Sequence, residues 1–275
     1  MPDCSPLTGG CAALCRSARE PLSRTAPARA RAWLLVEHLG PWPAFGWPAD
    51  LPPAAAEALA LAPAFDVRPQ LIRPADRSGK RPHRTGKRPE RTATRPERPQ
   101  RTVIVAGGPA GARWLERRVT DDLGDLKKLD LAALAEGDAP GFGVLVRERI
   151  LLVCTHAKRD ACCARFGAPV ARELSRLGFP VWETTHLGGD RFAANLACLP
   201  DGTYHGTLDV ESAAGVAFAC LRGAVSDPFY RGRAGIPGES GGSGDEPDGP
   251  NRGPNHPGGP SYPAFAIDLA SRQVR

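Results

Sequence analysis

The sequence predicts an α/β fold made of two similar halves, with mixed sheets flanked by helices. Short apolar runs of strand length alternate with segments of helical periodicity. The order strand, helix, three strands, helix occurs twice along the chain. Much of the remaining chain is rich in glycine and proline, and its 31 glycines and 29 prolines indicate that a large part lies outside regular structure.

The first half begins with an apolar strand, and a helix with prolines at its start follows. The predicted strands are residues 32–37, 67–73, 102–106 and 113–119, and the predicted helices are residues 53–62 and a segment within 121–136. The glycine-rich segment 103–111 imitates a flavin-binding turn. Ala106 stands at its first glycine position, however, so we expect a plain hairpin turn.

The second half repeats this order of elements. Its predicted strands are residues 149–154, 180–185, 193–199 and 203–208, and its predicted helices are residues 169–177 and 210–221. Val170, Leu174 and Leu177 share one face of the first of these helices. Pro169 in its first turn and Gly178 just past its end favour these bounds.

A βαβ unit followed by a hairpin and a closing helix is the thioredoxin-like arrangement, so we predict two thioredoxin-like halves. The N-terminal half spans residues 16–145, and the C-terminal half, which carries the candidate site, spans residues 146–234. Residues 235–275 form a glycine- and proline-rich tail with a short terminal helix at 264–273.

Residues 79–101 interrupt the first half with a tandem basic heptapeptide. They hold nine Lys and Arg residues against two Glu, while the whole chain has a net charge of +6. Repeated prolines block helix formation and the like charges repel, which predicts an extended, disordered insert. The insert is interpreted either as a tether that contacts a polyanion weakly or as a solvated spacer.

Two further features concern the compartment. No apolar run approaches the roughly 18 residues that cross a bilayer, so we expect no membrane partner. The N-terminus lacks the pattern of a secretory signal, and we expect a cytoplasmic protein. In a reducing compartment, its eight cysteines are expected to be free, catalytic or metal-bound.

The candidate site lies on two loops that follow neighbouring predicted strands. Cys154 and Cys163 flank the first loop, and Lys158 and Arg159 between them favour thiolates if they point inward. Cys162 is adjacent to Cys163, so only one of these two side chains is expected to face the site. The second loop offers His186, followed by two glycines that allow close backbone approach.

Asp190 lies four residues beyond His186 and offers a further donor. Both loops project from the same end of parallel strands, where α/β sheets present ligands. Two cysteines, a histidine and one more donor suit either zinc or an iron–sulfur cluster. The sequence therefore predicts a metal site at Cys154, Cys163, His186 and a fourth residue.

The segments CTHAKRDACC and VWETTHLGGDRFAANLACLPDGTYHG, together with EPLSRTAPARARAWLLVEHLGPW, resemble the sucrase/ferredoxin-like family of thioredoxin-fold [2Fe–2S] proteins. The resemblance runs from about residue 15 to residue 233. It implies a cluster held by a CX8C motif at Cys154 and Cys163 and by the first histidine of HxGGH at His186.

The second histidine of that motif falls on Asp190, as in what looks like a bacterial HxGGD variant. A carboxylate is an uncommon cluster ligand, which leaves the fourth position open although Asp190 is favoured. The alternatives are Cys198, Cys162, His156, Cys11 and Cys15.

The resemblance implies an electron-transfer protein, a one-electron carrier more than a stand-alone enzyme, with a [2Fe–2S] cluster in its C-terminal half and an unidentified redox partner protein. Lys158, Arg159 and Arg191 flank the loops and suit an anionic partner. The competing interpretation is a structural zinc protein or a thiol–disulfide oxidoreductase that uses Cys154 and Cys163. A third is an interaction scaffold tethered by the basic insert.

Three other residues are candidates for ligands or for the core. His205 and Asp209, near the closing hairpin, are expected on the surface, and Trp182 in the core. No pair of carboxylates is placed as a glycosidase requires, so sugar hydrolysis is not expected despite the family name.

Overall fold

The computed structural model describes residues 10–27, 30–76 and 100–235. Its strands are β1 (Ala32–Glu37), β2 (Val67–Pro74), β3 (Arg101–Gly107), β4 (Trp114–Thr120), β5 (Val144–Leu145), β6 (Ile150–Cys154), β7 (Val181–Thr184), β8 (Leu196–Leu199), β9 (Thr203–His205) and β10 (Tyr230–Arg233). Its α-helices are α1 (Gly10–Ala18), α2 (Pro53–Leu61), α3 (Leu131–Glu136), α4 (Ala161–Arg176) and α5 (Val210–Leu221). Short 3-10 helices form η1 (Ala62–Phe65), η2 (Leu123–Lys128) and η3 (Asp190–Phe192).

All of these strands join one sheet in the order β10-β9-β8-β6-β7-β2-β1-β3-β4-β5. In the first half, β1 pairs with β2 in parallel and with β3 antiparallel, and β3 pairs with β4. In the second half, β6 pairs with β7 in parallel and with β8 antiparallel, and β8 pairs with β9. The predicted repeat of elements is thus present as a repeat of strand order, and the mixed α/β class is confirmed.

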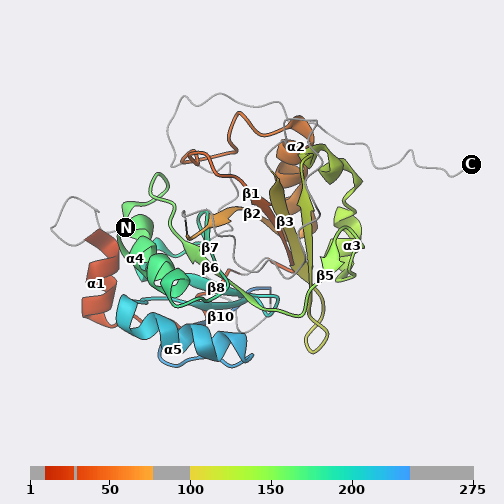
Figure 1. The fold of residues 1–275 in the computed structure, drawn as a ribbon. Coiled ribbons are helices and arrows are strands. Elements are labelled where there is room, and N and C mark those ends of the chain that lie inside the picture. The colour runs from red at the N-terminus through yellow and green to blue at the C-terminus, as the bar shows by residue number, and fades with distance from the viewer. Residues whose placement is uncertain (1–9, 28–29, 77–99, 236–275) are drawn as a thin grey trace, which may run out of the picture.

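The antiparallel pairing of β2 with β7 makes one sheet out of the two halves. Ile72 faces Thr184 and Pro74 faces Trp182 across this seam. The two halves of the sheet run in clearly different directions on either side of it (Figure 1). The likeness to thioredoxin and the boundary between residues 145 and 146 stay predictions.

The core lies on both faces of the sheet, because successive side chains of a strand point to opposite faces. On one face, α2, η2 and α3 cover the first half, while α4 and α5 cover the second (Figure 1). On the other face, side chains from both halves form a single cluster that includes Trp33, Ile104, Leu152 and Trp182. The expected burial of Trp182 is confirmed, with 3% of its surface exposed.

Helix α4 begins eight residues earlier than predicted. The Asp160 side chain accepts a hydrogen bond from the backbone N–H of Cys162 and caps the helix at Ala161. Pro169 therefore lies inside the helix, and its expected place in the first turn is wrong. Packing accounts for this, because the buried face runs through the proline from Cys163 to Leu174.

Smaller differences concern elements with weak sequence signals. The predicted helix within 121–136 is divided into η2 and α3, and the Asp130 side chain caps α3. Helix α1 was not predicted, and its Arg16 guanidinium donates to the backbone carbonyls of Ala193, Thr207 and Leu208. The segment 103–111 forms the β3–β4 hairpin, as expected.

The tail from residue 236, with its predicted helix at 264–273, lies outside the described residues, as do residues 77–99, which include most of the basic insert. Arg101, the last residue of the predicted insert, begins β3, so its assignment to a disordered segment is wrong. Among the residues that are described, no helix combines the length and apolar character that crossing a bilayer requires.

We expect that the insert is dispensable for folding. The end of β2 and the start of β3 lie at the same sheet edge on either side of β1, two strand spacings or roughly 10 Å apart. A variant in which Gly-Ser-Gly replaces residues 79–99 should therefore keep its melting temperature within a few degrees and should elute from heparin at much lower salt.

The matched control keeps the length of the insert and changes its eight Lys and Arg residues between 79 and 99 to Gln. It should elute as early as the shortened variant. Aggregation of the shortened variant alone would show that the insert is structural.

Candidate metal centre

Two thiols and an imidazole converge at the edge of the sheet in the second half. Cys154 ends β6, Cys163 lies in the first turn of α4, and His186 follows β7 by two residues. Their ligand atoms all lie within 4.8 Å of one another, and Cys163 Sγ is 3.5 Å from His186 Nδ1. Both cysteines are buried and the histidine is half-buried. This is the one such group found among the described residues.

The sheet topology brings these residues together. Strands β6 and β7 are parallel neighbours, and Cys154 stands opposite Thr184, so both chains leave the sheet at the same edge. The loop after β6 turns into α4 at the Asp160 cap, and the first turn of the helix returns Cys163 to that edge. The sequence-based expectation that Cys154, Cys163 and His186 lie close together agrees with this geometry, although Cys163 lies in the first turn of α4 and not on a loop.

Gly167 allows α4 to lie this close to Cys154. A Cβ atom at position 167 would overlap the backbone carbonyl oxygen of Cys154. Helix and strand can therefore touch only where the helix lacks a side chain. This contact sets the distance between the two thiols.

The adjacent cysteine points elsewhere. The Cys162 side chain is buried in a small cluster with Ala12 and Ala193, and Phe166 packs against it. Successive residues of a helix are about 100° apart around its axis, so the two side chains diverge. The expectation that only one of them faces the site agrees with this packing.

The contacts among the three groups shift the pKa values of the two thiols. Burial raises the pKa of Cys154, but hydrogen bonds with Cys163 and His186 outweigh it and hold this pKa well below its usual value. The pKa of Cys163 is raised, mainly by the hydrogen bond to Cys154 and secondly by burial. The same contacts thus shift the two pKa values in opposite directions, and a bound cation would displace the protons that remain on the thiols.

The backbone of the histidine loop is held by polar side chains from other strands. His186 O accepts a hydrogen bond from Gln70 Nε2 at 3.1 Å. Arg231, which is 1% exposed, donates to Gly188 O at 3.1 Å and to Asn195 Oδ1 at 2.7 Å. Asn195 in turn donates to Gly189 O at 2.8 Å. These hydrogen bonds therefore hold the backbone of the loop in place.

Sequence reasoning missed Gln70 and Arg231, because nothing in the local pattern relates β2 or β10 to this loop. The glycines of the loop gave a better signal. Gly189 has φ of +69°, and a Cβ atom there would overlap the Arg231 guanidinium. Glycine at this position thus allows both the positive φ and the close approach of the buried Arg231 side chain.

Asp190 lies outside the group of three donors. It begins η3, and its charge is close enough to contribute to the raised pKa of Cys163. Its role as fourth ligand stays a prediction.

The alternatives for the fourth position are distributed over several environments. His156 is buried, and its Nε2 donates to Pro43 O at 2.8 Å, while Nδ1 has no hydrogen-bond partner among the described residues. The pKa of Cys15 is raised to about 12, mainly by burial and secondly by the hydrogen bond to Glu20, which keeps that thiol protonated. Cys198 Sγ lies near Cys220, in a different core cluster. The Cys11 side chain is not among those described.

The basic residues near the loops do not enter the site. Lys158 is exposed, the Arg159 guanidinium lies 4.5 Å from the ring centre of Phe45, and Arg191 Nε lies 2.8 Å from Glu20 Oε1. The lowered pKa of Cys154 is therefore due to Cys163 and His186, whereas the sequence pattern favoured Lys158 and Arg159.

The two residues near the closing hairpin behave differently from each other. Asp209 is exposed and caps α5 through a reciprocal bond with Ser212, so its surface position is confirmed. The surface position expected for His205 is wrong, since 0% of its surface is exposed. Helix α5 covers it, and Cys220 and Tyr230 contact its ring.

The fold and this site define a mixed α/β protein with a candidate Cys2His metal centre at the edge of its sheet. The sucrase/ferredoxin-like family model matches residues 59–232, and the chain belongs to that family. The match excludes the N-terminal motif before residue 59 that also resembled the family. No curated protein and no solved structure matched the chain.

We expect Gly167→Ala to lower the free energy of unfolding by about 1–3 kcal/mol, because the new methyl group must push α4 away from the Cys154 carbonyl. The same variant should bind divalent zinc or cobalt more weakly, since Cys163 moves with the helix. Urea denaturation and cobalt titration monitored by absorbance measure the two effects.

Gly215→Ala in α5 is the matched control. No atom lies within 4 Å of the position that a Cβ atom would take at Gly215, and alanine favours helix by up to about 1 kcal/mol. Equal behaviour of the two variants would refute the close approach at Gly167.

Proposed function

We propose that this protein is a one-electron carrier with a [2Fe–2S] cluster in its C-terminal half. The observation that carries the proposal is the convergence of Cys154, Cys163 and His186 within 4.8 Å at the sheet edge. Thiolates are the usual protein ligands of iron–sulfur clusters, and imidazole replaces some of them in clusters of higher potential. Membership of the sucrase/ferredoxin-like family supports the same choice.

The chain's own residues prepare the site for such a cluster. The lowered pKa of Cys154 favours loss of the proton that a metal must displace, and the hydrogen-bonded backbone of the histidine loop holds the His186 ring. When bound, the cluster supplies one-electron redox chemistry. His186 is half-buried, so it is the point at which an electron has the shortest path to solvent and to a partner.

We propose Asp190 as the fourth ligand, because the loop that positions His186 also carries Asp190. His156 is the competing ligand, since its Nε2–H bond to Pro43 leaves a buried Nδ1 for coordination, and such a bond is common for metal-bound histidines.

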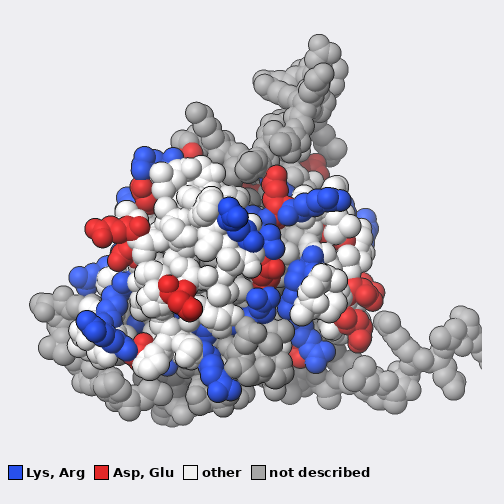
Figure 2. Space-filling view, turned by 90° about the horizontal axis from the view of Figure 1, so that it is seen from below, with Lys and Arg blue, Asp and Glu red and all other residues white. Residues whose placement is uncertain are grey.

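The redox partner is proposed to be a protein with an acidic surface near its own redox group. Lys158, Arg159 and Arg191 surround the loops of the site, and like-signed charge around a redox group steers an oppositely charged partner. Figure 2 shows Lys and Arg interspersed with Asp and Glu over the face seen from below, so that face does not stand out as a docking surface of one sign. Thiolate ligands also require a reducing compartment, for which we propose the cytosol.

The second candidate function is a zinc site or a thiol–disulfide oxidoreductase at Cys154 and Cys163. The convergence of the two sulfur atoms within 4.8 Å favours it, together with the lowered pKa of Cys154, since thiol exchange uses a thiolate beside a thiol. Colour separates the candidates, because zinc and bare thiols do not absorb visible light.

Protein purified without air should be coloured and should contain iron and acid-labile sulfide in equal amounts. Cys154→Ser and Cys163→Ser should each abolish the visible absorbance, because each removes a thiolate ligand. The matched control is Cys162→Ser, which changes the neighbouring cysteine that packs on Ala12 and Ala193. A colourless protein loaded with zinc would refute the electron-carrier function.

The fourth ligand is tested by Asp190→Ala and His156→Ala, compared by visible and EPR spectra of the reduced protein. We expect Asp190→Ala to change both spectra and His156→Ala to leave them as in the parent. Asp190→His should keep the cluster and raise its potential, since a neutral imidazole replaces a carboxylate. If His156→Ala changed the spectra and Asp190→Ala did not, the fourth ligand would be His156 and not Asp190.

A further inference from the structure

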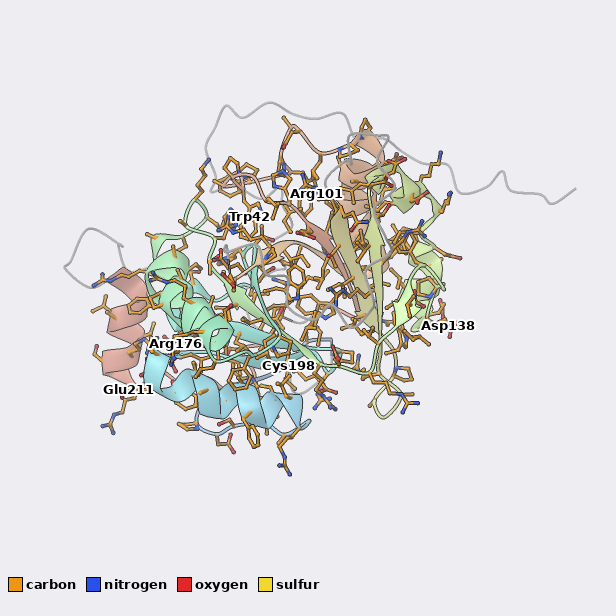
Figure 3. All side chains as sticks on the ribbon, viewed as in Figure 1. Trp42, Arg101, Asp138, Arg176, Cys198 and Glu211 are labelled. Carbon is orange, nitrogen blue, oxygen red and sulfur yellow. The ribbon has the colours of Figure 1, made fainter. Side chains whose placement is uncertain are left out.

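A second pair of cysteines lies beside a histidine on the opposite face of the same half. Cys198 comes from β8, His205 from β9 and Cys220 from the last turn of α5. Figure 3 labels Cys198 on the sheet beside α5. The side chains are 0%, 0% and 1% exposed, and none of them contributes to the metal centre described above.

The strand register and the helix cap bring these three residues together. Cys198 pairs with Thr203 and Leu196 pairs with His205, so Cys198 and His205 point to the same face as diagonal neighbours. Asp209 caps α5 immediately after β9, and the helix then lies over this face with Cys220 in contact. Cys198 Sγ lies 3.7 Å from the Cys220 carbonyl oxygen.

The contacts shift the pKa values of the two thiols in opposite directions. Cys220 Sγ lies 3.6 Å from His205 Nδ1 and forms a hydrogen bond with the Cys198 thiol. These two hydrogen bonds, the one with Cys198 first, lower the pKa of Cys220 to about 6 although burial raises it. The same thiol–thiol bond raises the pKa of Cys198. The nearby charges of Asp201 and Arg149 act in opposite directions on this pair.

We propose that Cys198 and Cys220 are a redox-active dithiol that hydrogen peroxide converts to a disulfide. The Cys220 thiolate attacks one peroxide oxygen, an S–O bond forms and the O–O bond breaks, which leaves a sulfenic acid on Cys220 and releases hydroxide. Cys198 sulfur then attacks Cys220 sulfur, an S–S bond forms and the S–O bond breaks. The second hydroxide leaves and takes up the Cys198 proton as water. The dithiol loses two electrons and the peroxide gains them.

Burial selects the oxidant. Cys220 is 1% exposed, so the proposed oxidant must be as small as hydrogen peroxide, whereas the tripeptide disulfide of glutathione requires an open approach to the sulfur. The resulting disulfide joins α5 to β8 and restrains the unfolded chain, so oxidation raises the melting temperature.

Tryptic digestion separates this pair from the metal centre. Residues 192–222 contain no internal Lys or Arg, so Cys198 and Cys220 fall on one peptide, while Cys154 and Cys163 fall on peptides 150–158 and 160–165. The native full-length protein is treated with hydrogen peroxide, the peroxide is removed, and free thiols are then alkylated in denaturant; peptide 192–222 should carry no alkyl group. It should be lighter by two hydrogen atoms than its reduced form.

Variants assign the roles within the pair. Cys198→Ser should stop the reaction at a Cys220 sulfenic acid, which dimedone traps when the oxidised protein is unfolded in its presence, and Cys220→Ser should leave Cys198 unoxidised. His205→Asn should slow disulfide formation at neutral pH several-fold, because it removes one of the hydrogen bonds that stabilise the thiolate. Circular dichroism confirms that each variant is folded, and Cys198→Ala replaces any serine variant that is not.

Two results would overturn the proposal: a peptide 192–222 that still carries two alkyl groups after peroxide, or a disulfide that forms only once denaturant is added. The outcome is independent of the cluster, because it is read from a peptide that contains neither Cys154 nor Cys163.

Discussion

The antiparallel seam between β2 and β7 is the contact on which the site depends. Across it, Arg73 and Glu183 form an ion pair at 2.7 Å, and Glu183 also accepts a hydrogen bond from Thr155, the residue that follows Cys154. Removing one partner of a buried ion pair costs about 3–5 kcal/mol. The first half of the molecule therefore supports the end of β6, although the thiols belong to the second half. Gln70 extends this support to the loop of His186.

The elements that the sequence predicts best are those with local signals. The bounds of β1 and α5 agree with the prediction, because an apolar run of strand length and a capped apolar helix are readable within a few residues. The same holds for Cys154 and His186, since parallel strands end at a common edge. The union of the halves into one sheet was not predictable in this way, because the β2–β7 register joins residues more than 100 positions apart.

The errors have the same origin. Pro169 suggested a helix start, but the continuous buried face of α4 and the Asp160 cap outweigh the lost backbone hydrogen bond. His205 looked like a surface residue because its partner Cys220 is fifteen positions away and reaches it only after α5 folds back over β9. In both cases tertiary packing decided what a local pattern left open. Arg231 was missed for the same reason, because its hydrogen bonds join β10 to a loop more than 40 positions earlier in the sequence.

The two clusters of the second half contain the same groups, two thiols and one imidazole, yet their geometry suits different chemistry. At the sheet edge, three ligand atoms lie mutually within 4.8 Å around a half-buried histidine, which leaves a route for electrons to the surface. Under α5, the imidazole contacts Cys220 while Cys198 lies against the Cys220 backbone, and the whole group is enclosed. A metal requires donors that converge on one point, whereas a disulfide requires only that two sulfur atoms meet. The positions of β6, β8 and their covering helices thus separate the site proposed for one-electron transfer from the site proposed for two-electron thiol oxidation within a single half of the sheet.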